Sequence, residues 1–313
     1  MKNNPLVSII TVNYNQAAVT AYFLESLSVL VYTNFEVIVV DNASAEPSAF
    51  LKEKFPFITH ITSPQNIGFA GGNNIGLFFA KGEYVLFINN DTIVSPNLLD
   101  VLVGHLQSNE QCAIACPKIK YHWQPDTIQY AGAVGLYPIT CRSYDIGYMQ
   151  KDDGRFDDIR KTDLPNGAAM MVPMKLIKKI GPMSEKFFLY YEELDWAARF
   201  KSAGYEIHYV GTTGILHKES VSTGKNSPFK TFYLYRNRLL YIRRNYKGWK
   251  GFASSAFFCF VSVPCHSLKH VLKGEWGHVS SIAKGLFWHF ANNPFSEPKI
   301  NSVSLRNLLT VQS

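Results

Sequence analysis

Acidic residues are missing from one long stretch of the sequence, between Ser220 and Gly274, although the whole chain has 24 of them. Ten of the 31 Lys and Arg residues fall in this stretch, which leaves 21 basic against 24 acidic residues elsewhere. The formal net charge of +7 is therefore carried by one segment of an otherwise near-neutral chain. This distribution disfavours a protein that coats nucleic acid, and it marks the segment where a polyanion or a membrane would act.

Cysteine is scarce as well. The five cysteines form no CxxC pair and no His/Cys cluster at the sequence spacing of a zinc site. We therefore expect no disulfide framework and a reducing, cytoplasmic compartment. The first residues, MKNNPLVSII, lack a charged region followed by a long apolar run. We expect a strand there rather than a signal peptide.

The common nucleotide-binding motifs are also absent. No GxGxxG follows the first apolar run, and no GxxxxGK[ST] occurs anywhere, which disfavours a dinucleotide-dependent dehydrogenase and a P-loop enzyme. A glycine-rich stretch, Gly68–Gly72, does precede a helical pattern. Its glycines either serve a ligand or simply allow a helix to pack closely on a strand.

What is present is an alternation of short β-branched runs and helical patterns, in a chain of 47% hydrophobic residues. This alternation predicts a three-layer α/β fold around a mainly parallel sheet. The expected strands are 6–12, 35–40, 57–62, 84–88, 112–116, 167–172 and 205–210. The expected helices are 17–30, 47–55, 70–80, 96–109, one from 174, 192–203 and 229–246. Between 118 and 162 we expect loops and short antiparallel strands.

Polar residues follow the expected strands, where open parallel sheets bind their ligands. Asp41 follows a buried strand and could accept hydrogen bonds from a base or a ribose, or could be a turn residue. Asp91 ends another strand and could bind a hard divalent cation. His217, after the run Gly214–Leu216, is either structural or a metal ligand.

The acidic cluster YYEELDW lies at the start of an expected helix. Glu192 and Asp195 share one helical face, and Glu193 points about 100° away from Glu192. One carboxylate in a first turn complements the helix dipole. Three of them suggest that one acts as a general base on a reacting group.

Eight ordered motifs make the chain resemble the family 2 glycosyltransferases over about residues 5–247, and among them the bacterial rhamnosyltransferase-like branch. They are VSIITVNYNQ, EVIVVDNAS, NIGFAGGNNIG, LFINNDT, NGAAMMVP, YYEELDW, LHKES and YLYRNRLLYIRRN. The resemblance implies a GT-A fold, a nucleotide-sugar donor such as dTDP-rhamnose or a UDP-sugar, and a divalent metal, Mg²⁺ or Mn²⁺. It also implies an inverting displacement at the anomeric carbon.

The resemblance assigns roles to individual residues. Donor binding falls to Thr11, Asn13, Asn15, Asp41, Asn66, Gly68, Asn89, Asn90 and Lys218. Asp91 and His217 would hold the metal, although Asn89 replaces the first Asp of the family's DxD motif. The acceptor side would include Asn166, Gly167, Ala168 and Trp196.

The catalytic base is the second departure from the family pattern. The family's Glu-Asp motif aligns with Glu192 and Glu193, so Glu193 takes the position that an Asp normally holds. One extra methylene moves this carboxylate, which leaves Asp195 as the reserve candidate.

The C-terminal region begins as a basic helix and becomes apolar. We expect a catalytic domain at 1–228, with a donor half at about 1–117 and an acceptor half at about 118–228, followed by a helical region at 229–313. Gly251–Leu268 has 18 residues without a formal charge, marginal for a membrane span. A pair of helices lying in the membrane plane fits better. Its basic anchors would be Arg243, Arg244, Lys247, Lys250, Lys269 and Lys273. Packing on the catalytic domain, or a dimer, is the alternative.

The leading interpretation is an inverting, metal-dependent glycosyltransferase of surface polysaccharide synthesis at the cytoplasmic face of the membrane. Rhamnose is the favoured sugar, and a saccharide or lipid-linked saccharide is the acceptor. A nucleotidyltransferase would need a Gly-rich loop with Arg or Lys after the first strand, which NYNQ does not supply. A nucleotide-sugar-binding scaffold with an impaired site is the non-enzymatic alternative, because Asn89 and Glu193 depart from the family pattern. A nucleic-acid partner is least favoured.

Overall fold

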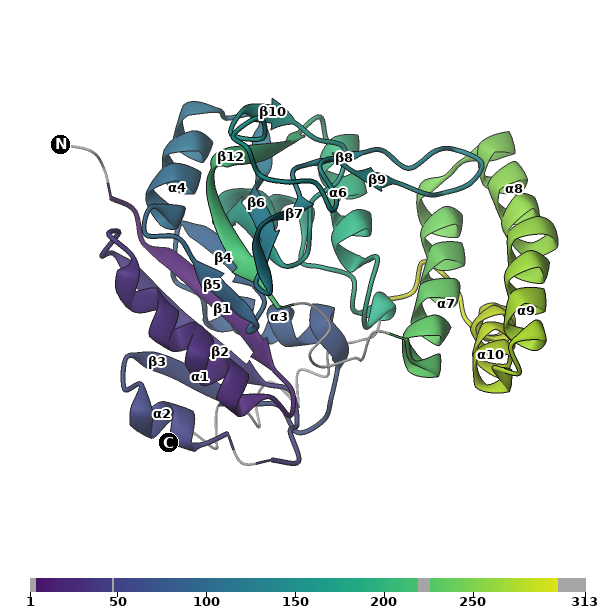
Figure 1. The fold of residues 1–313 in the computed structure, drawn as a ribbon, viewed down its shortest axis with the longest axis horizontal. Coiled ribbons are helices and arrows are strands. Elements are labelled where there is room, and N and C mark those ends of the chain that lie inside the picture. Colours follow the sequence, from purple (N-terminus) through teal and green to yellow (C-terminus); the bar gives the residue numbers. More distant parts are fainter. Residues whose placement is uncertain (1–3, 47, 219–225, 298–313) are drawn as a thin grey trace.

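The computed structural model describes residues 4–46, 48–218 and 226–297, and shows an α/β body with a block of helices beside it (Figure 1). The predicted three-layer α/β architecture is confirmed. The first strands of its large sheet are β1 (Val7–Asn13), β2 (Phe35–Asp41), β3 (Ile58–Thr62) and β4 (Tyr84–Ile88). They run parallel in the order β4-β1-β2-β3. Their Val and Ile side chains are buried because helices cover the sheet.

The other half of the sheet is mixed, and the short antiparallel strands expected between 118 and 162 are present in it. Its members are β5 (Thr92–Val94), β6 (Cys112–Tyr121), β7 (Gln124–Tyr130), β10 (Ile159–Lys161), β11 (Ala169–Pro173) and β12 (Glu206–His217). β11 lies between β4 and β6 and runs antiparallel to both. β12 runs parallel to β6 and continues past a register shift to His217, instead of ending at Val210. His217 is therefore the last residue of a central strand.

Helices cover both faces and mostly lie where the periodicity predicts. They are α1 (Ala17–Ser26), η1 (Leu27–Val29), α2 (Phe50–Lys54), α3 (Gly68–Phe79), α4 (Leu98–Ser108), α5 (Met174–Ile180), η2 (Glu185–Phe187) and α6 (Glu192–Ser202). Within α3, a methyl group at Gly76 would lie 2.4 Å from Cγ2 of Ile10, so this glycine allows the helix to approach β1. The irregular region carries a small hairpin, β8 (Ala133–Val134) and β9 (Tyr144–Asp145).

The C-terminal block consists of four helices and one π-helical turn. These are α7 (Pro228–Asn245), α8 (Gly248–Phe257), the π-helical turn η3 (Phe258–Ser262), α9 (Val263–Leu272) and α10 (Trp276–Ala291). α7 starts at a Ser-Pro step, where the Ser227 hydroxyl accepts a hydrogen bond from the Lys230 amide. α10 packs closely on α7, because a methyl group at Gly285 would lie only 3.1 Å from the carbonyl oxygen of Phe232.

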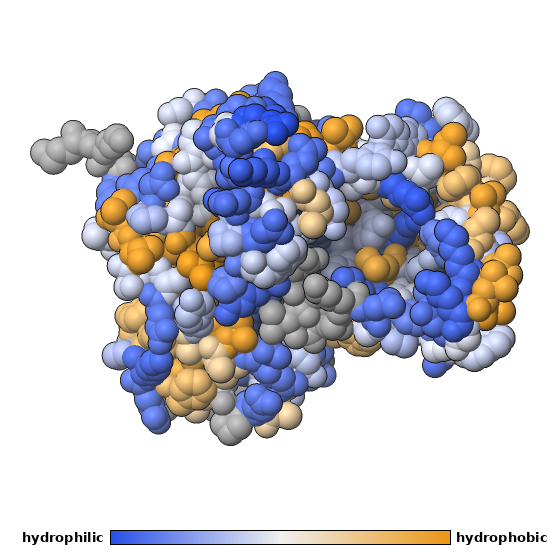
Figure 2. All heavy atoms as spheres, in the orientation of Figure 1, coloured by the Kyte–Doolittle hydropathy of each residue, from blue (hydrophilic) through white to orange (hydrophobic). Residues whose placement is uncertain are grey.

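Gly248–Leu272, which spans α8, η3 and α9, is long and apolar enough to cross a membrane by length and composition, and only 22% of its most apolar window is buried. Figure 2 shows apolar side chains gathered at the outer end of the helical block. Two of the expected membrane anchors are used internally instead. Arg244 pairs with Asp195 and Glu297, and Arg243 bonds to His289.

Candidate active site

A cleft of about 330 Å³ opens at the carboxyl ends of the parallel strands. Its lining comes from β1, β7 and β12, the loops after β1, β2, β3 and β4, the start of α3, the loop before α6, and the start of α7. They are Val12, Tyr14, Asn42, Asn66, Gly68, Phe69, Asn89, Asn90, Asp91, Gln129, Phe188, Leu189, Tyr190, His217, Phe229 and Lys230. The cleft therefore lies where a parallel sheet positions its ligands.

A buried polar network supports the floor of this cleft. The Asn13 amide donates to Asp41 Oδ2 at 2.8 Å, and the Thr20 hydroxyl donates to Asn13 Oδ1 at 2.8 Å. The Asn90 amide in turn donates to Thr20 Oγ1 at 2.8 Å. These bonds join the ends of β1, β2 and β4, so that Asn13 and Asp41 hold the loops in position.

Several predicted donor-binding residues therefore lie outside the cleft lining. Thr11 and Asn13 are fully buried, and Val12 and Tyr14 line the cleft in their place. Asp41 is only 2% exposed because its carboxylate oxygens accept bonds from Asn13 and the Ser44 amide. In this structure Asn13 and Asp41 bond to neighbouring parts of the protein, and their role in donor binding stays a prediction. Asn15 Oδ1 accepts from the Ala45 amide and is likewise absent from the lining.

The loop around Gly68 does reach the cleft as predicted. Gly68 has a φ of +77°, and a methyl group there would lie 2.1 Å from the Phe188 carbonyl oxygen. Asn66 Oδ1 accepts a bond from the Gly68 amide at 2.9 Å, and Asn42 donates to Asn66 at 3.0 Å. Only glycine fits this close approach, so the glycine-rich stretch serves both the cleft and the packing of α3.

Asp91 and His217 lie side by side on the cleft wall. His217 Nε2 is 3.1 Å from Asp91 Oδ1, and both side chains are more than 90% buried. The other ring nitrogen, Nδ1, lies 2.8 Å from the Gln129 amide oxygen. Because that oxygen can only accept, Nδ1 carries a proton, and in the neutral form of the ring Nε2 presents a lone pair.

This arrangement leaves two acceptors facing each other. The Asn89 amide lies 3.3 Å from Nε2, and among the described residues Asp91 Oδ1 has no hydrogen-bond donor. A carboxylate oxygen and an imidazole lone pair that converge in this way fit a divalent cation. Gln129 fixes the orientation of the His217 ring, as the hydrogen-bond partners of metal-ligating histidines do, and no sequence pattern indicated it.

The expected cation of the donor site also differs. Lys218 lies with its ammonium group 4.3 Å from the Tyr22 ring centroid and is absent from the cleft lining. Lys230, in the first turn of α7, lines the cleft instead, 5.5 Å from the Tyr190 ring centroid. Its place in the basic helix was visible in the sequence, but its distance from the other motifs gave no indication of this role.

Glu193 lies beside the acceptor-side loop. A methyl group at Gly167 would lie 3.8 Å from Glu193 Cδ, and the next residue, Ala168, accepts a hydrogen bond from the Asn89 amide at 2.9 Å. The Asn166 side chain holds this turn by accepting from the Ala168 amide. The structure thus brings the predicted loop between Glu193 and the strand end that carries Asp91.

Burial perturbs the two glutamates strongly. Desolvation raises the pKa of Glu193 above its ordinary value, and the nearby Asp145 charge raises it further. Desolvation and then the charge of Glu193 raise the pKa of Glu192. One oxygen of each side chain has no hydrogen-bond partner within the described part of the chain. A buried carboxylate with a raised pKa suits proton abstraction near neutral pH.

Asp195 and Trp196 are placed differently from the expectations. Asp195 is 1% exposed and its carboxylate meets Arg244 Nε at 3.0 Å and the Asn245 amide at 3.0 Å. These partners make Asp195 an anchor between α6 and α7. Trp196 is fully buried against Phe87 and donates to the Gly181 carbonyl, so it does not reach an acceptor.

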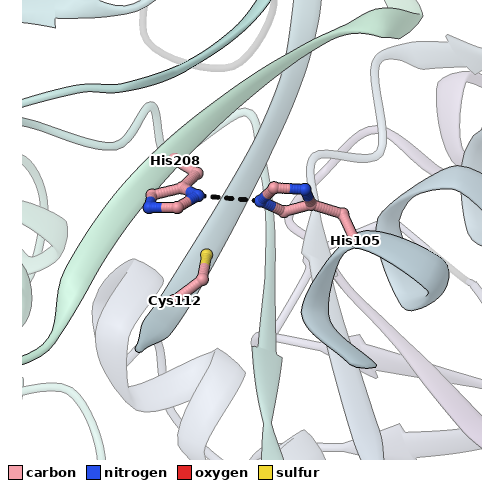
Figure 3. Close-up of side chains that lie close together, drawn as sticks. All are labelled: His105, Cys112 and His208. Atoms are coloured by element: carbon pink, nitrogen blue, oxygen red, sulfur yellow. Dashed lines mark hydrogen bonds between the residues drawn. The ribbon is translucent and has the colours of Figure 1, made fainter. Parts of the chain in front are cut away.

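A second group of potential metal ligands lies at the amino ends of β6 and β12 (Figure 3). The ligand atoms of His105, Cys112 and His208 all lie within 4.8 Å of one another, although their sequence spacing resembles no zinc motif. His208 Nε2 meets Glu206, His208 Nδ1 meets His105 Nε2 at 2.8 Å, and His105 Nδ1 meets Asn109. These contacts give every nitrogen of the two rings a hydrogen-bond partner.

Comparisons with known proteins agree with this geometry. The family model described as glycosyl transferase family 2 matches residues 8–171. The hexosyltransferase Agl10 of low-salt glycan biosynthesis in Haloferax volcanii is 27% identical over 75% of this chain and 74% of its own. An N-acetylglucosaminyl-diphospho-decaprenol L-rhamnosyltransferase of Mycobacterium tuberculosis is 21% identical over 78% of this chain and 86% of its own.

Other curated relatives are much longer. The chain spans 28% of one from Sinorhizobium fredii and 18% of the O-antigen biosynthesis protein RfbC of Myxococcus xanthus, to which it is 26% identical over 71% of its own length.

Solved structures show the same fold. The mannosyltransferase PcManGT from Pyrobaculum calidifontis, in complex with GDP-Man and Mn²⁺, aligns with a TM-score of 0.57 and 15% identity over 99% of this chain and 81% of that one. GalNAc-T7 with UDP, GalNAc and Mn²⁺ aligns with a TM-score of 0.62 and 13% identity over 78% and 48%. At this identity the likeness establishes the fold alone, and that fold is GT-A. With the family model matching more than half of its length, the chain belongs to glycosyl transferase family 2.

Proposed function

We propose that this chain transfers a hexose, with rhamnose favoured, from a nucleotide-diphosphate donor to a hydroxyl of a saccharide or lipid-linked saccharide during surface polysaccharide synthesis. The convergence of Asp91 Oδ1 and His217 Nε2 at 3.1 Å, in a cleft at the carboxyl ends of the parallel strands, carries this proposal. The names of the relatives from Haloferax, Myxococcus and Mycobacterium support a role in glycan synthesis, and the last of them supports rhamnose.

Asp91 and His217 would hold a divalent cation, Mg²⁺ or Mn²⁺, and two solved relatives of the same fold contain Mn²⁺. When bound, such a cation neutralises the diphosphate of the donor and stabilises charge on the leaving group. Gln129 keeps His217 in the tautomer that presents Nε2, at 2.8 Å from Nδ1. Lys230 places a further positive charge at the mouth of the cleft.

Glu193 would act as the base for the acceptor hydroxyl. Its carboxylate takes the hydroxyl proton while that oxygen bonds to the anomeric carbon from the side opposite the diphosphate. The bond from this carbon to the diphosphate oxygen breaks in the same displacement, and its electron pair leaves with the nucleotide. One displacement without a covalent enzyme intermediate inverts the configuration.

Donor hydrolysis across a panel of nucleotide sugars tests this function. With Mg²⁺ or Mn²⁺ present we expect release of nucleotide diphosphate from one sugar class, loss of the activity in excess chelator, and thermal stabilisation by the same donor. Asp91→Ala should abolish hydrolysis. Full activity in chelator with Asp91→Ala tolerated would remove the metal from the mechanism, and no turnover of any donor would favour a binding scaffold.

We further propose that the C-terminal region, residues 229–313, of which 298–313 lie outside the described residues, attaches the enzyme to the cytoplasmic face of an anionic membrane. Its surface exposes large apolar side chains that no described residue covers. The most exposed are Phe252 at 79%, Phe260 at 81%, Leu272 at 78%, Phe287 at 69% and Phe290 at 87%. Exposed lysines accompany them at 247, 250, 269 and 273. Apolar side chains flanked by lysines suit an interfacial helix on anionic lipid.

Flotation of the full chain with vesicles containing phosphatidylglycerol tests this attachment. The double variant Phe252→Ser, Phe260→Ser should lose binding, whereas Phe57→Ser, which alters an exposed Phe of the α/β body, should keep it. Release of the protein by alkaline carbonate would indicate peripheral attachment, and resistance to carbonate would indicate that Gly248–Leu272 spans the bilayer. Equal flotation of both variants would contradict the proposed surface.

A further inference from the structure

A second cavity, of about 350 Å³, lies between the α/β body and the helical block. We call it the arginine pocket. It is lined by Leu136, Cys141, Arg142, Ser143, Tyr191, Leu194, Leu234, Tyr235, Arg238 and Phe258. Figure 1 shows the loop between β8 and β9 extending toward the helices of this block. The cavity combines two guanidinium groups with an apolar wall.

Arg238 is a buried cation without an anionic partner. It is 8% exposed, and its guanidinium lies 4.8 Å from the Phe258 ring centroid. One nitrogen, Nη2, donates to the Thr140 carbonyl, but Nε is buried without any acceptor among the described residues. No carboxylate in the described part of the chain forms an ion pair with it. A buried charge left in this state is costly, so the site fits an added anion.

Arg142 extends the positive character of the pocket toward its mouth. This side chain is exposed, and its Nη2 lies 3.3 Å from His266 Nε2. The other ring nitrogen, His266 Nδ1, lies 2.7 Å from the Tyr235 hydroxyl. Because Arg142 can only donate, His266 accepts at Nε2 and donates from Nδ1, which leaves the Tyr235 hydroxyl proton free. Burial and then the charges of Arg142 and Lys269 lower the pKa of His266 and keep this ring neutral.

The position of the pocket relates it to the reaction. Phe188, Leu189 and Tyr190 line the donor cleft, whereas Tyr191 and Leu194 line the arginine pocket. The glutamates 192 and 193 lie between these two sets in one short segment. An acceptor whose hydroxyl meets Glu193 could therefore place its next group in the pocket. The exposed apolar residues of α8, η3 and α9 begin at the wall formed by Phe258.

We propose that the arginine pocket binds the diphosphate of a lipid-linked saccharide acceptor, with Arg238 and Arg142 as its cationic ligands. The inference rests on the proposed glycosyl transfer and names the chemical class of its acceptor. Diphosphate oxygens accept from guanidinium groups and from the free Tyr235 hydroxyl, and the lipid chain continues over the apolar face of the helical block. One relative acts on a diphospho-decaprenol acceptor according to its name.

The test compares two acceptors with the same sugar, one on a polyprenyl diphosphate and one on a neutral alkyl chain of similar length. Wild-type enzyme should show a lower KM for the diphosphate acceptor. Arg142→Gln and Arg238→Gln should raise that KM about ten-fold or more, the usual effect of losing a charged hydrogen bond, and should abolish the preference over the alkyl acceptor. Lys284→Gln, an exposed change on α10, is the matched control and should keep the preference.

The outcomes separate this inference from the proposed function. Donor hydrolysis by the wild type, without acceptor, reports on glycosyl transfer alone. If hydrolysis occurs but Arg142→Gln keeps the wild-type preference, the pocket does not bind the diphosphate. If Arg142→Gln no longer floats with phosphatidylglycerol vesicles but keeps the wild-type KM for the acceptor, the proposal is also overturned, since the pocket would then hold a phospholipid headgroup. Arg238 is buried, so Arg238→Gln could unfold. The test then rests on Arg142→Gln, which changes an exposed side chain, and on Tyr235→Phe, which removes only the hydroxyl group.

Discussion

Glu193 and Asp195 are two residues apart, yet the structure predicts opposite consequences for neutralising them. Glu193 has a buried oxygen without a partner in the described residues and lies beside the acceptor loop. Asp195 is 1% exposed and holds Arg244 and Asn245 from α7. The isosteric changes Glu193→Gln and Asp195→Asn therefore separate a base from an anchor.

For Asp195→Asn we expect a loss of about 3 kcal/mol in the free energy of unfolding, because removing one partner of a buried ion pair typically costs about 3–5 kcal/mol. The lower end applies because Arg244 keeps its bond to the Pro294 carbonyl and its ion pair with Glu297 at 2.9 Å. For Glu193→Gln we expect kcat to fall by about 100- to 10 000-fold, the range of a lost general base, without loss of stability.

Urea denaturation gives the stability of each variant, and transfer measured well below the unfolding midpoint gives kcat. The expected pattern is a stable, inactive Glu193→Gln and an unstable Asp195→Asn whose folded fraction turns over. Wild-type kcat in Glu193→Gln would refute its role as base. A stable but inactive Asp195→Asn would show that the α7 contacts have been misinterpreted and that Asp195 is the base.

Four further predictions concern the titration of Glu193, the cleft lysine Lys230 and the loop before α6. Because burial raises the pKa of Glu193, the rate of transfer should rise with pH to a plateau, and the midpoint of this rise should lie above the ordinary Glu pKa of about 4.3. A rise with its midpoint at the ordinary value would contradict this. The raised pKa of Glu193 also affects stability. It stabilises the fold at pH values below the pKa of Glu193 in the unfolded chain, and this contribution is lost as the pH rises through the pKa in the folded protein. Between these two pH values the unfolding midpoint of the wild type should therefore fall relative to that of Glu193→Gln. Lys230→Gln should raise the donor KM about ten-fold and Lys218→Gln much less, since only Lys230 lines the cleft, and equal effects in steady-state kinetics would contradict that placement. Asn237 does not line the cleft, but its amide donates to the carbonyls of Phe187, Leu189 and Tyr190. Asn237→Ala should therefore weaken donor binding. Unchanged donor affinity by calorimetry would show that the loop 187–190 keeps its conformation without these bonds.

The sequence was informative where local chemistry determines structure. β-branched runs marked β1 to β4 within about one residue, and the polar residues after them do meet at one edge of the sheet. Sequence reasoning failed where long-range pairing decides. Nothing local shows that β11 inserts antiparallel between β4 and β6, or that β12 continues to His217.

The same limit applies to individual side chains of the site. Asp195 and Trp196 share the motif of Glu193, but α7 and the core occupy them. Their partners are distant in sequence, so residue type and spacing could not separate an anchor from a base. Gln129 and Lys230 were missed for the same reason, since their roles depend on contacts with His217 and the cleft.

The antiparallel strand β11 has a further consequence for how this enzyme can vary. Because β11 pairs with both β4 and β6, the donor side and the acceptor side belong to one continuous sheet. We therefore expect the two halves to move little relative to each other. For the proposed glycosyl transfer, we expect substrate choice to reside in segments that leave the sheet, such as the loop between β8 and β9 and residues 188–191. Exchanging these loops between relatives could alter the acceptor while the metal ligands stay in place, which makes them the natural modules for engineering.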